Sequence, residues 1–314
     1  MSSTRMFPNL PRTEPKLRDS TAVTKYMECP RKYFYSMVLG YKKTTQEPYF
    51  AFGNAYHKFR EVLEIHWMAD PLLSNSQEYI MAALERAMKY AKKHLVPGDK
   101  GTKWEFMNVD RVMKSCLKGA EHWLREKKEG RIEVIAIEQP FQIVLPDGEI
   151  IAGRLDQKII RGGKPRGRDF KTSSQAPIYY SKGLSPNDQF SRYTFAENKL
   201  VGWDENDPNH RPPVEGQDIE VLFNTKTTGP AIETYPVNKS RHELMTWLKE
   251  QEFWHRMLTM SREEDRYPMN TKSCNFCEFH KVCAMSSETM QQSYLKNNFK
   301  HEPWDCTHST KEDE

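Results

Sequence analysis

Two aspartates and a lysine near the middle of the chain have residue types suited to metal-assisted hydrolysis. Asp156 stands in the segment GRLDQ, and Asp169 and Lys171 follow in the segment RDFKT. Residues two apart on a β-strand point to the same face of a sheet, so Asp169 and Lys171 would project together. Carboxylates bind hard cations such as Mg²⁺, which activate water for attack on a phosphodiester, and a lysine can orient that water or stabilise the developing charge. Each residue alone could be an ordinary solvent-facing charge, so it is the combination that predicts a hydrolytic site.

Alternation of apolar and polar residues predicts the strands that must carry these side chains. The segments IEVIAIE and FQIVL read as two strands, and the turn residues PDG lead into a third strand that contains Asp156. A basic, glycine-rich connection then leads to a short strand with Asp169 and Lys171. The expected strands are 132–138, 141–145, 149–160 and 169–172, with the connection at 161–168. Its basic residues could contact phosphates or be solvated; they are Arg161, Lys164, Arg166 and Arg168.

Helical periodicity surrounds these strands on both sides in the sequence. Before them we expect a short helix from Ser20 or Thr21 to the Cys29-Pro30 break, and helices at about 51–68, 75–95 and 108–128. After them we expect a helix at 185–201, strands at 218–225 and 231–237, and a long helix at 240–264. This order predicts an α/β (α+β) fold with a mixed central sheet and an N-terminal helical addition.

The composition favours a folded chain that uses cysteines for metal binding. There are 314 residues, a formal net charge of +4 and six cysteines. The small net charge is weak evidence for a polyanionic partner, so local basic patches must carry that argument. No apolar run is long enough to span a membrane and no secretory signal is evident, so we expect a cytoplasmic protein without membrane contact. In such a protein cysteines more often bind metal than form disulfides.

The motifs together resemble the RecB-type branch of the PD-(D/E)xK nuclease superfamily. In that branch a G-x-x-x-H element precedes the strands and a Q-x-x-x-Y element follows them. Here GNAYH, from Gly53 to His57, supplies the first, and QFSRY, from Gln189 to Tyr193, supplies the second. The resemblance runs from about residue 20 to 285. It implies a restriction-endonuclease-like core over residues 20–290, between a flexible arm at 1–19 and a tail at 291–314.

The resemblance also implies residue roles. Catalysis would involve Asp156, Asp169, Lys171, Gln189 and Tyr193, with Lys171 as the catalytic lysine. The metal, Mg²⁺ or Mn²⁺, would be held by His57, Asp156, Asp169 and the Phe170 carbonyl. Asp169 stands where the family usually has glutamate. Glu138 could face the site, although we expect it to be structural.

Four of the six cysteines form a separate pattern. Cys274, Cys277 and Cys283 follow the expected core as C-x2-C-x5-C, and Cys29 precedes it. Four thiolates can hold zinc or an iron–sulfur cluster. The arrangement resembles iron–sulfur nucleases related to AddB and to CRISPR-associated exonucleases, which implies a [4Fe-4S] cluster joining the two ends of the domain. The alternative is Zn²⁺ on the three later cysteines, with Cys29 merely buried.

Basic and aromatic residues after Cys29 suggest contacts with single-stranded DNA, namely Arg31, Lys32 and Tyr33. The combined expectation is a metal-dependent DNA exonuclease acting on single strands or DNA ends in recombination, repair or replication. The sequence has no G-x-x-x-x-G-K-[ST] motif, so a helicase or recombinase partner could supply unwinding. The alternatives are a non-catalytic iron–sulfur adaptor that binds nucleic acid and a CRISPR spacer-trimming nuclease.

Overall fold

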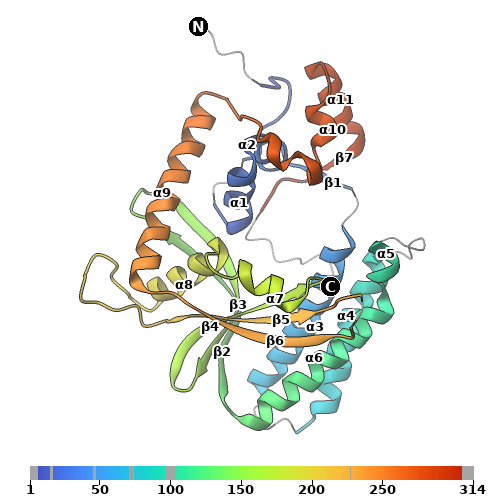
Figure 1. The fold of residues 1–314 in the computed structure, drawn as a ribbon, viewed down its shortest axis with the longest axis vertical. Coiled ribbons are helices and arrows are strands. Elements are labelled where there is room, and N and C mark those ends of the chain that lie inside the picture. Colours follow the sequence, from blue (N-terminus) through green and yellow to red (C-terminus); the bar gives the residue numbers. More distant parts are fainter. Residues whose placement is uncertain are drawn as a thin grey trace.

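The fold is given by a computed structural model, which describes residues 6–14, 17–44, 47–70, 72, 74–95, 103–226 and 228–305. Its centre is a five-stranded sheet in the order β2-β3-β4-β5-β6 (Figure 1). Only β4 and β5 are parallel, and the other neighbours are antiparallel. The strands are β2 (Ile132–Val144), β3 (Ile150–Arg161), β4 (Lys164–Ser173), β5 (Gly216–Phe223) and β6 (Ala231–Asn238). This confirms the expected mixed sheet.

Helices cover both faces of the sheet (Figure 1). On one face α3 (Pro48–Ala69), α4 (Ser76–His94) and α6 (Val109–Glu129) share a buried core with sheet residues such as Ile159. On the other face α8 (Asp188–Leu200) and α9 (Arg241–Glu263) pack with β2 and β3 around Phe195 and Trp247. The short helices α5 (Lys103–Phe106), α7 (Pro177–Tyr180) and η2 (Ser181–Gly183) complete these layers.

The two ends of the chain pack together beside the sheet (Figure 1). Strand β1 (Tyr41–Lys43) pairs with β7 (Phe299–His301), and both ends contribute to one apolar cluster that includes Phe34 and Phe279. The other elements here are α1 (Ser20–Glu28), α2 (Pro30–Tyr33), η1 (Phe34–Val38), η3 (Thr271–Phe276), α10 (His280–Cys283) and α11 (Glu288–Asn298). The residues expected as a tail thus include most of α11 and all of β7, up to the last described residue, 305.

Strand boundaries differ from the expectation at two places. The two strands expected between 132 and 145 are one strand, β2, with an irregularity after Val134 and a positive φ of 49° at Glu138. The connection expected at 161–168 is wrong, because β3 and β4 form a hairpin whose turn is Gly162-Gly163. Both glycines have positive φ, which a glycine adopts without strain. Helix α1 begins as expected, but its N-cap is Asp19, whose carboxylate accepts a hydrogen bond from the Ala22 amide.

Arg166 and Arg168 consequently lie inside the protein and do not form a basic surface loop. Arg166 Nε is 2.8 Å from Asp218 Oδ1, and Arg168 Nη2 is 2.6 Å from Glu126 Oε2. Arg168 also pairs with Glu220 of β5. Buried guanidinium groups require such partners. These arginines therefore connect the strands and helix α6 inside the protein and are not available to bind phosphate.

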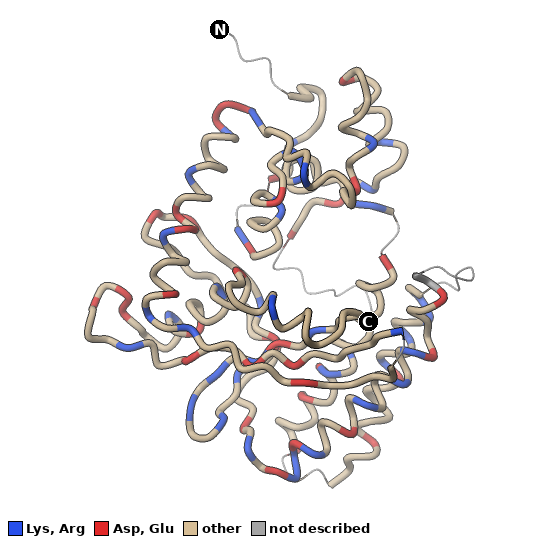
Figure 2. Tube along the Cα trace, in the orientation of Figure 1, with Lys and Arg blue, Asp and Glu red and all other residues tan. Residues whose placement is uncertain are grey.

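Charged residues are spread over all layers of the molecule (Figure 2). Lys and Arg occur on helices, strands and connections alike. Across the described residues, no helix combines the length and the apolar composition needed to cross a bilayer.

Glu197 of α8 offers a test of the packing between α8 and the sheet. Its Oε2 accepts a hydrogen bond from Gln217 Nε2 at 2.8 Å, and burial raises the pKa of its carboxyl from 4.5 to about 7. Between these values the folded state keeps a proton that the unfolded state has released, so stability falls as the pH rises through this window. We expect the free energy of unfolding of Glu197→Gln, measured by urea titration, to exceed that of wild type by about 1–3 kcal/mol at pH 8. At pH 5 the difference should be smaller. An equal difference at both pH values would contradict this.

Candidate active site

The two aspartates and the lysine come together where β3 and β4 diverge. Lys171 Nζ lies 2.7 Å from Asp169 Oδ2, on the same face of β4. Asp156 is the next residue of β3 beyond the last Cα pair, Gln157 with Arg168. Its Oδ2 accepts a hydrogen bond from the Phe170 amide at 2.9 Å. The register of two neighbouring strands therefore brings Asp156 beside Asp169 and Lys171.

Helix α3 brings His57 to the same place. His57 Nδ1 is 3.7 Å from Asp156 Oδ2, and its imidazole also contacts the Phe170 backbone. Gly53 lies one turn earlier, where an added Cβ would sit 3.1 Å from Thr172 Oγ1 of β4. A Cβ at Gly53 would crowd the Thr172 hydroxyl by a few tenths of an ångström, so the close approach of α3 to β4 favours glycine here.

Helix α8 contributes Gln189 and Tyr193 from its first two turns. Gln189 Nε2 donates to Asp169 Oδ1 at 3.3 Å and to the Tyr193 hydroxyl at 3.1 Å. The two residues are four apart and therefore share one helix face. Gln189 thus binds the carboxylate oxygen of Asp169 that does not contact Lys171, and Tyr193 contacts Gln189.

Two glutamates lie near this group: Glu61, which was not expected there, and Glu138, which could face the site by its sequence position but was expected to be structural. Glu61 lies one turn after His57 on α3, and the pKa of both His57 and Asp156 responds to its charge. Glu138 lies on β2 between residues paired with Gln157 and Leu155, and so opposite Asp156. The i, i+4 spacing from His57 could have identified Glu61 from the sequence. Glu138 could not be identified in this way, because its placement depends on the irregular backbone of β2.

Burial shifts the titration of the whole group. It raises the pKa of Asp169 to about 6, although the Lys171 ammonium opposes the shift, and it raises the pKa of Asp156. Burial, with help from Asp156 and Glu61, raises the pKa of Glu138 to about 8. Burial together with Lys171 lowers the pKa of His57 to about 4. Burial also disfavours the charged form of Lys171, but the Asp169 and Asp156 carboxylates outweigh it and raise the Lys171 pKa.

The donor set fits a divalent cation. Two carboxylates, a neutral imidazole and a backbone carbonyl offer the oxygen and nitrogen ligands that Mg²⁺ and Mn²⁺ accept. A second set, His122, Glu126 and Glu220, also brings ligand-type atoms within 4.8 Å of one another. There, however, the carboxylates already pair with Arg168, and Glu220 also pairs with Arg60. We interpret this second set as a buried ion-pair network.

The cysteines expected to bind a cluster lie where the chain ends meet. The Asn270 amide donates to Cys29 Sγ at 3.3 Å, and Cys274 Sγ donates to the Asn270 carbonyl at 3.9 Å. Burial raises the pKa of Cys277 and of Cys283, and the nearby Cys29 raises each further. Cys29 from the N-terminal part of the chain and Cys274, Cys277 and Cys283 from the C-terminal part thus lie in one region of the fold. Cys116 is fully buried in the helical core, away from these four cysteines in the fold.

The residues expected to contact DNA after Cys29 lie in this cysteine region. Tyr33 is fully buried and donates its hydroxyl to Glu14 at 2.9 Å. Arg31 Nε donates to the Tyr267 carbonyl, and Lys32 pairs with Glu28. A buried ring cannot stack on a base, so the expectation for Tyr33 is corrected. The charges of Arg31 and Lys32 offset part of the rise that burial causes in the pKa of Cys283 and Cys277, respectively.

Comparison with known proteins adds independent evidence. Residues 20–284 match the family described as the PD-(D/E)XK nuclease superfamily. The fold is similar to a protein from Eubacterium rectale provisionally described as an exonuclease, with 10% identity and a TM-score of 0.51 over 87% of this chain and 90% of that chain. It also matches the crystal structure of SSO0001, with 15% identity over 86% of this chain and 87% of that chain, but the TM-score of 0.35 is too low to carry an argument. The comparison with curated proteins gives no match.

The titration of Asp169 leads to a prediction for metal binding. A divalent cation competes with protons for this carboxylate, whose pKa is about 6, whereas His57 stays neutral down to about pH 4. We therefore expect the affinity for Mn²⁺, measured by calorimetry, to fall about fourfold between pH 7.5 and 5.5, because a carboxyl with a pKa of about 6 loses most of its anionic form over this range. Asp169→Asn should abolish binding at both pH values. An affinity that does not change over this range would exclude Asp169 as a ligand.

Proposed function

Because the chain belongs to the PD-(D/E)XK nuclease superfamily, we propose that it is a metal-dependent deoxyribonuclease that degrades DNA from ends or single strands. The observation that carries the proposal is the contact of Lys171 with Asp169, beside Asp156 and His57 where β3 and β4 diverge. This group unites carboxylates for a cation with an ammonium for the reacting oxygens. The fold similarity to a protein provisionally described as an exonuclease is in keeping with exonuclease action.

The proposed roles follow from the positions of the side chains. His57, Asp156, Asp169 and the Phe170 carbonyl would hold Mg²⁺ or Mn²⁺. The bound cation would polarise the scissile phosphate and lower the pKa of the attacking water. Lys171 would hold that water in line with the phosphorus and stabilise the negative charge that develops on the phosphoryl oxygens. Gln189 would keep Asp169 in place through its hydrogen bond, and Tyr193 would keep Gln189 in place.

We further propose that the protein belongs to the RecB/AddB-like branch and carries a [4Fe-4S] cluster on Cys29, Cys274, Cys277 and Cys283. Support comes from the convergence of these thiols from both chain ends and from the cations beside them. A cluster with four thiolates carries net negative charge, which Arg31 and Lys32 would offset. Its role would be structural, because binding energy at the meeting point of the chain ends becomes folding energy. Residues 20–290 would then form one nuclease domain.

The non-catalytic adaptor is less well supported, because Asp156, Asp169 and Lys171 are all present and Lys171 is in contact with Asp169. In the cell the enzyme would act in recombination, repair or replication. Strand separation would come from a helicase or recombinase partner, since the sequence has no P-loop.

Cleavage of end-labelled DNA tests the proposed activity. We expect single-stranded linear DNA to be degraded in the presence of Mg²⁺ or Mn²⁺, and Lys171→Met to slow cleavage by about 10²–10³-fold, the usual effect of removing one group that stabilises transition-state charge. Lys182→Met is the matched control, because Lys182 is an exposed lysine beyond the end of β4. Covalently closed single-stranded circles should resist cleavage. Cutting of circles as fast as linear strands would contradict exonuclease action, and equal rates for Lys171→Met and wild type would contradict the site.

Iron and sulfide analysis of anaerobically purified protein tests the cluster. We expect about four iron atoms per chain, with visible absorbance that Cys283→Ser removes, because the cluster needs all four thiolates. Cys306→Ser is the control for loss of a cysteine outside the proposed set. Stoichiometric zinc in place of iron would favour the zinc alternative, and metal content unchanged by Cys283→Ser would contradict both.

A further inference from the structure

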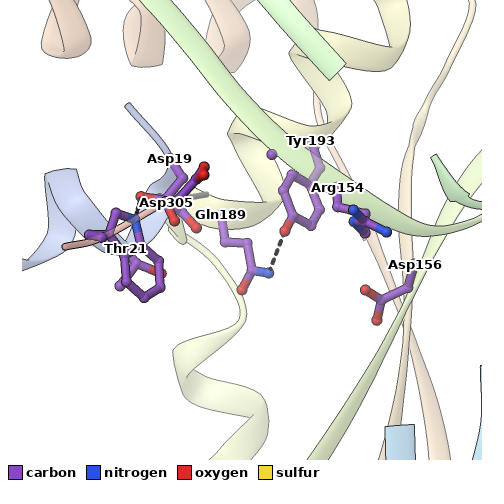
Figure 3. Close-up of a pocket in the computed structure, with 10 residues that line it drawn as sticks. Asp19, Thr21, Arg154, Asp156, Gln189, Tyr193 and Asp305 are labelled. Carbon is purple, nitrogen blue, oxygen red and sulfur yellow. Dashed lines mark hydrogen bonds between the residues drawn. The ribbon is translucent and has the colours of Figure 1, made fainter. Parts of the chain in front are cut away.

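A cavity of about 350 Å³ opens beside the candidate active site. One wall belongs to that site, since Asp156, Gln189 and Tyr193 line it. Figure 3 shows Gln189 and Tyr193 between Asp156 and Arg154 at one end and Asp19 and Asp305 at the other. The cavity therefore leads from the catalytic carboxylates toward the joined chain ends.

The far wall is built by two segments that are distant in sequence. Asp19 and Thr21 come from the start of α1, and Trp304 and Asp305 come from the segment after β7. The Trp304 indole N–H donates to Asp19 Oδ1 at 3.3 Å, and the same oxygen caps α1 through the Ala22 amide. The indole is thus fixed against a helix terminus. An aromatic side chain is held at the end of the cavity that lies away from the catalytic residues.

The two ends of the cavity are lined by different charged side chains. Arg154 lies at the catalytic end, where its Nη1 is 3.7 Å from Glu138 Oε2, and its side chain is about one third exposed. The carboxylates of Asp19 and Asp305 lie at the opposite end. With a divalent cation on the catalytic carboxylates, a phosphate would be favoured at the Arg154 end. It would be disfavoured near Asp19 and Asp305, although Arg192 and Lys25 offset part of the charge there. Carboxylates can instead accept hydrogen bonds from the exocyclic amines of bases, and an indole can pack against a base.

The volume is in the range of small-molecule sites, about 300–1,000 Å³. The cavity is large enough for one nucleotide. The carboxylates at its far end disfavour the phosphate of a further nucleotide beyond the first.

We propose that this cavity is a subsite for the terminal nucleotide of a DNA strand, with the base against Trp304 and the phosphate toward Arg154 and the catalytic carboxylates. The inference rests on the proposed nuclease function and adds to it a reason for action at ends. A strand that passed through the cavity would bring its next phosphate against Asp19 and Asp305. A strand that ends there avoids this repulsion. Trp304 then acts as a binding residue, outside the hydrolytic machinery.

Direct binding of small ligands tests the subsite without requiring activity. Calorimetry on the full-length protein, with Ca²⁺ in place of the catalytic cation, compares deoxyadenosine monophosphate with 2-deoxyribose 5-phosphate, which lacks the base. We expect wild type to bind the nucleotide about 5- to 100-fold more tightly, the range that stacking of one base on an aromatic ring supplies. Trp304→Leu, which keeps an apolar side chain without an aromatic face, should bind both ligands about equally. Trp304→Phe should restore most of the preference.

The comparison separates stacking from a purely structural role. If Trp304 only held the chain ends together, Trp304→Leu would weaken both ligands together and leave their ratio unchanged, which would overturn the proposal. Equal binding of the two ligands by wild type would also overturn it. Phe253→Leu is the matched control, because Phe253 is a half-exposed aromatic residue on α9 that does not line the cavity, and its ratio should equal that of wild type. If wild type binds the nucleotide more tightly than 2-deoxyribose 5-phosphate but does not cleave DNA, the nuclease proposal is refuted and the nucleotide subsite is supported.

Discussion

Burial of charge on the central strand β4 is the constraint on which the rest of the structure depends. On one face of β4, Arg168 is fully buried and pairs with Glu126 of α6 and Glu220 of β5. Removing a charge from water costs several kcal/mol unless a partner compensates it. Helix α6 and strand β5 must therefore sit where their carboxylates meet Arg168, and this fixes the depth of β4 in the fold. Because side chains alternate along a strand, the same placement directs Asp169 and Lys171 to the opposite face.

That opposite face is left short of positive charge. Lys171 is the cation nearest to Asp169 and Asp156, while Glu138 and Glu61 add further acidity and His57 is neutral near pH 7. Burial raises the pKa of Asp169 to about 6, and Asp156 adds to the shift against the opposing charge of Lys171, because protonation reduces the negative charge held there. A divalent cation would reduce it as well. The two faces of β4 thus differ in charge balance. On one face arginine balances the buried glutamates, and on the other face the aspartates could accept an added cation.

Helix α1 links the remaining features. Its first residues line the cavity beside the active site, and the helix ends at Cys29 in the cysteine region. The segment after β7 returns to α1 through Trp304. Order at the joined chain ends, which a cluster would increase, therefore positions the far wall of the cavity. Tyr33 is enclosed in this region, and Arg31 and Lys32 lie beside its cysteines.

The sequence by itself determined the mixed α/β core, most helix boundaries and the residues of the candidate site. Those inferences depend on local periodicity, on two-residue strand spacing and on short motifs such as GNAYH, which remain visible without tertiary contacts. Only the tertiary structure decided that Arg166 and Arg168 are buried, that Tyr33 is enclosed, that Glu138 joins the site and that Trp304 lies beside it. In each case the outcome depends on partners far away in sequence, such as Glu220 for Arg168 and Asp19 for Trp304. A charge or an aromatic ring has the same local pattern whether it faces water or a distant partner, because burial is a property of the assembled layers and not of the segment.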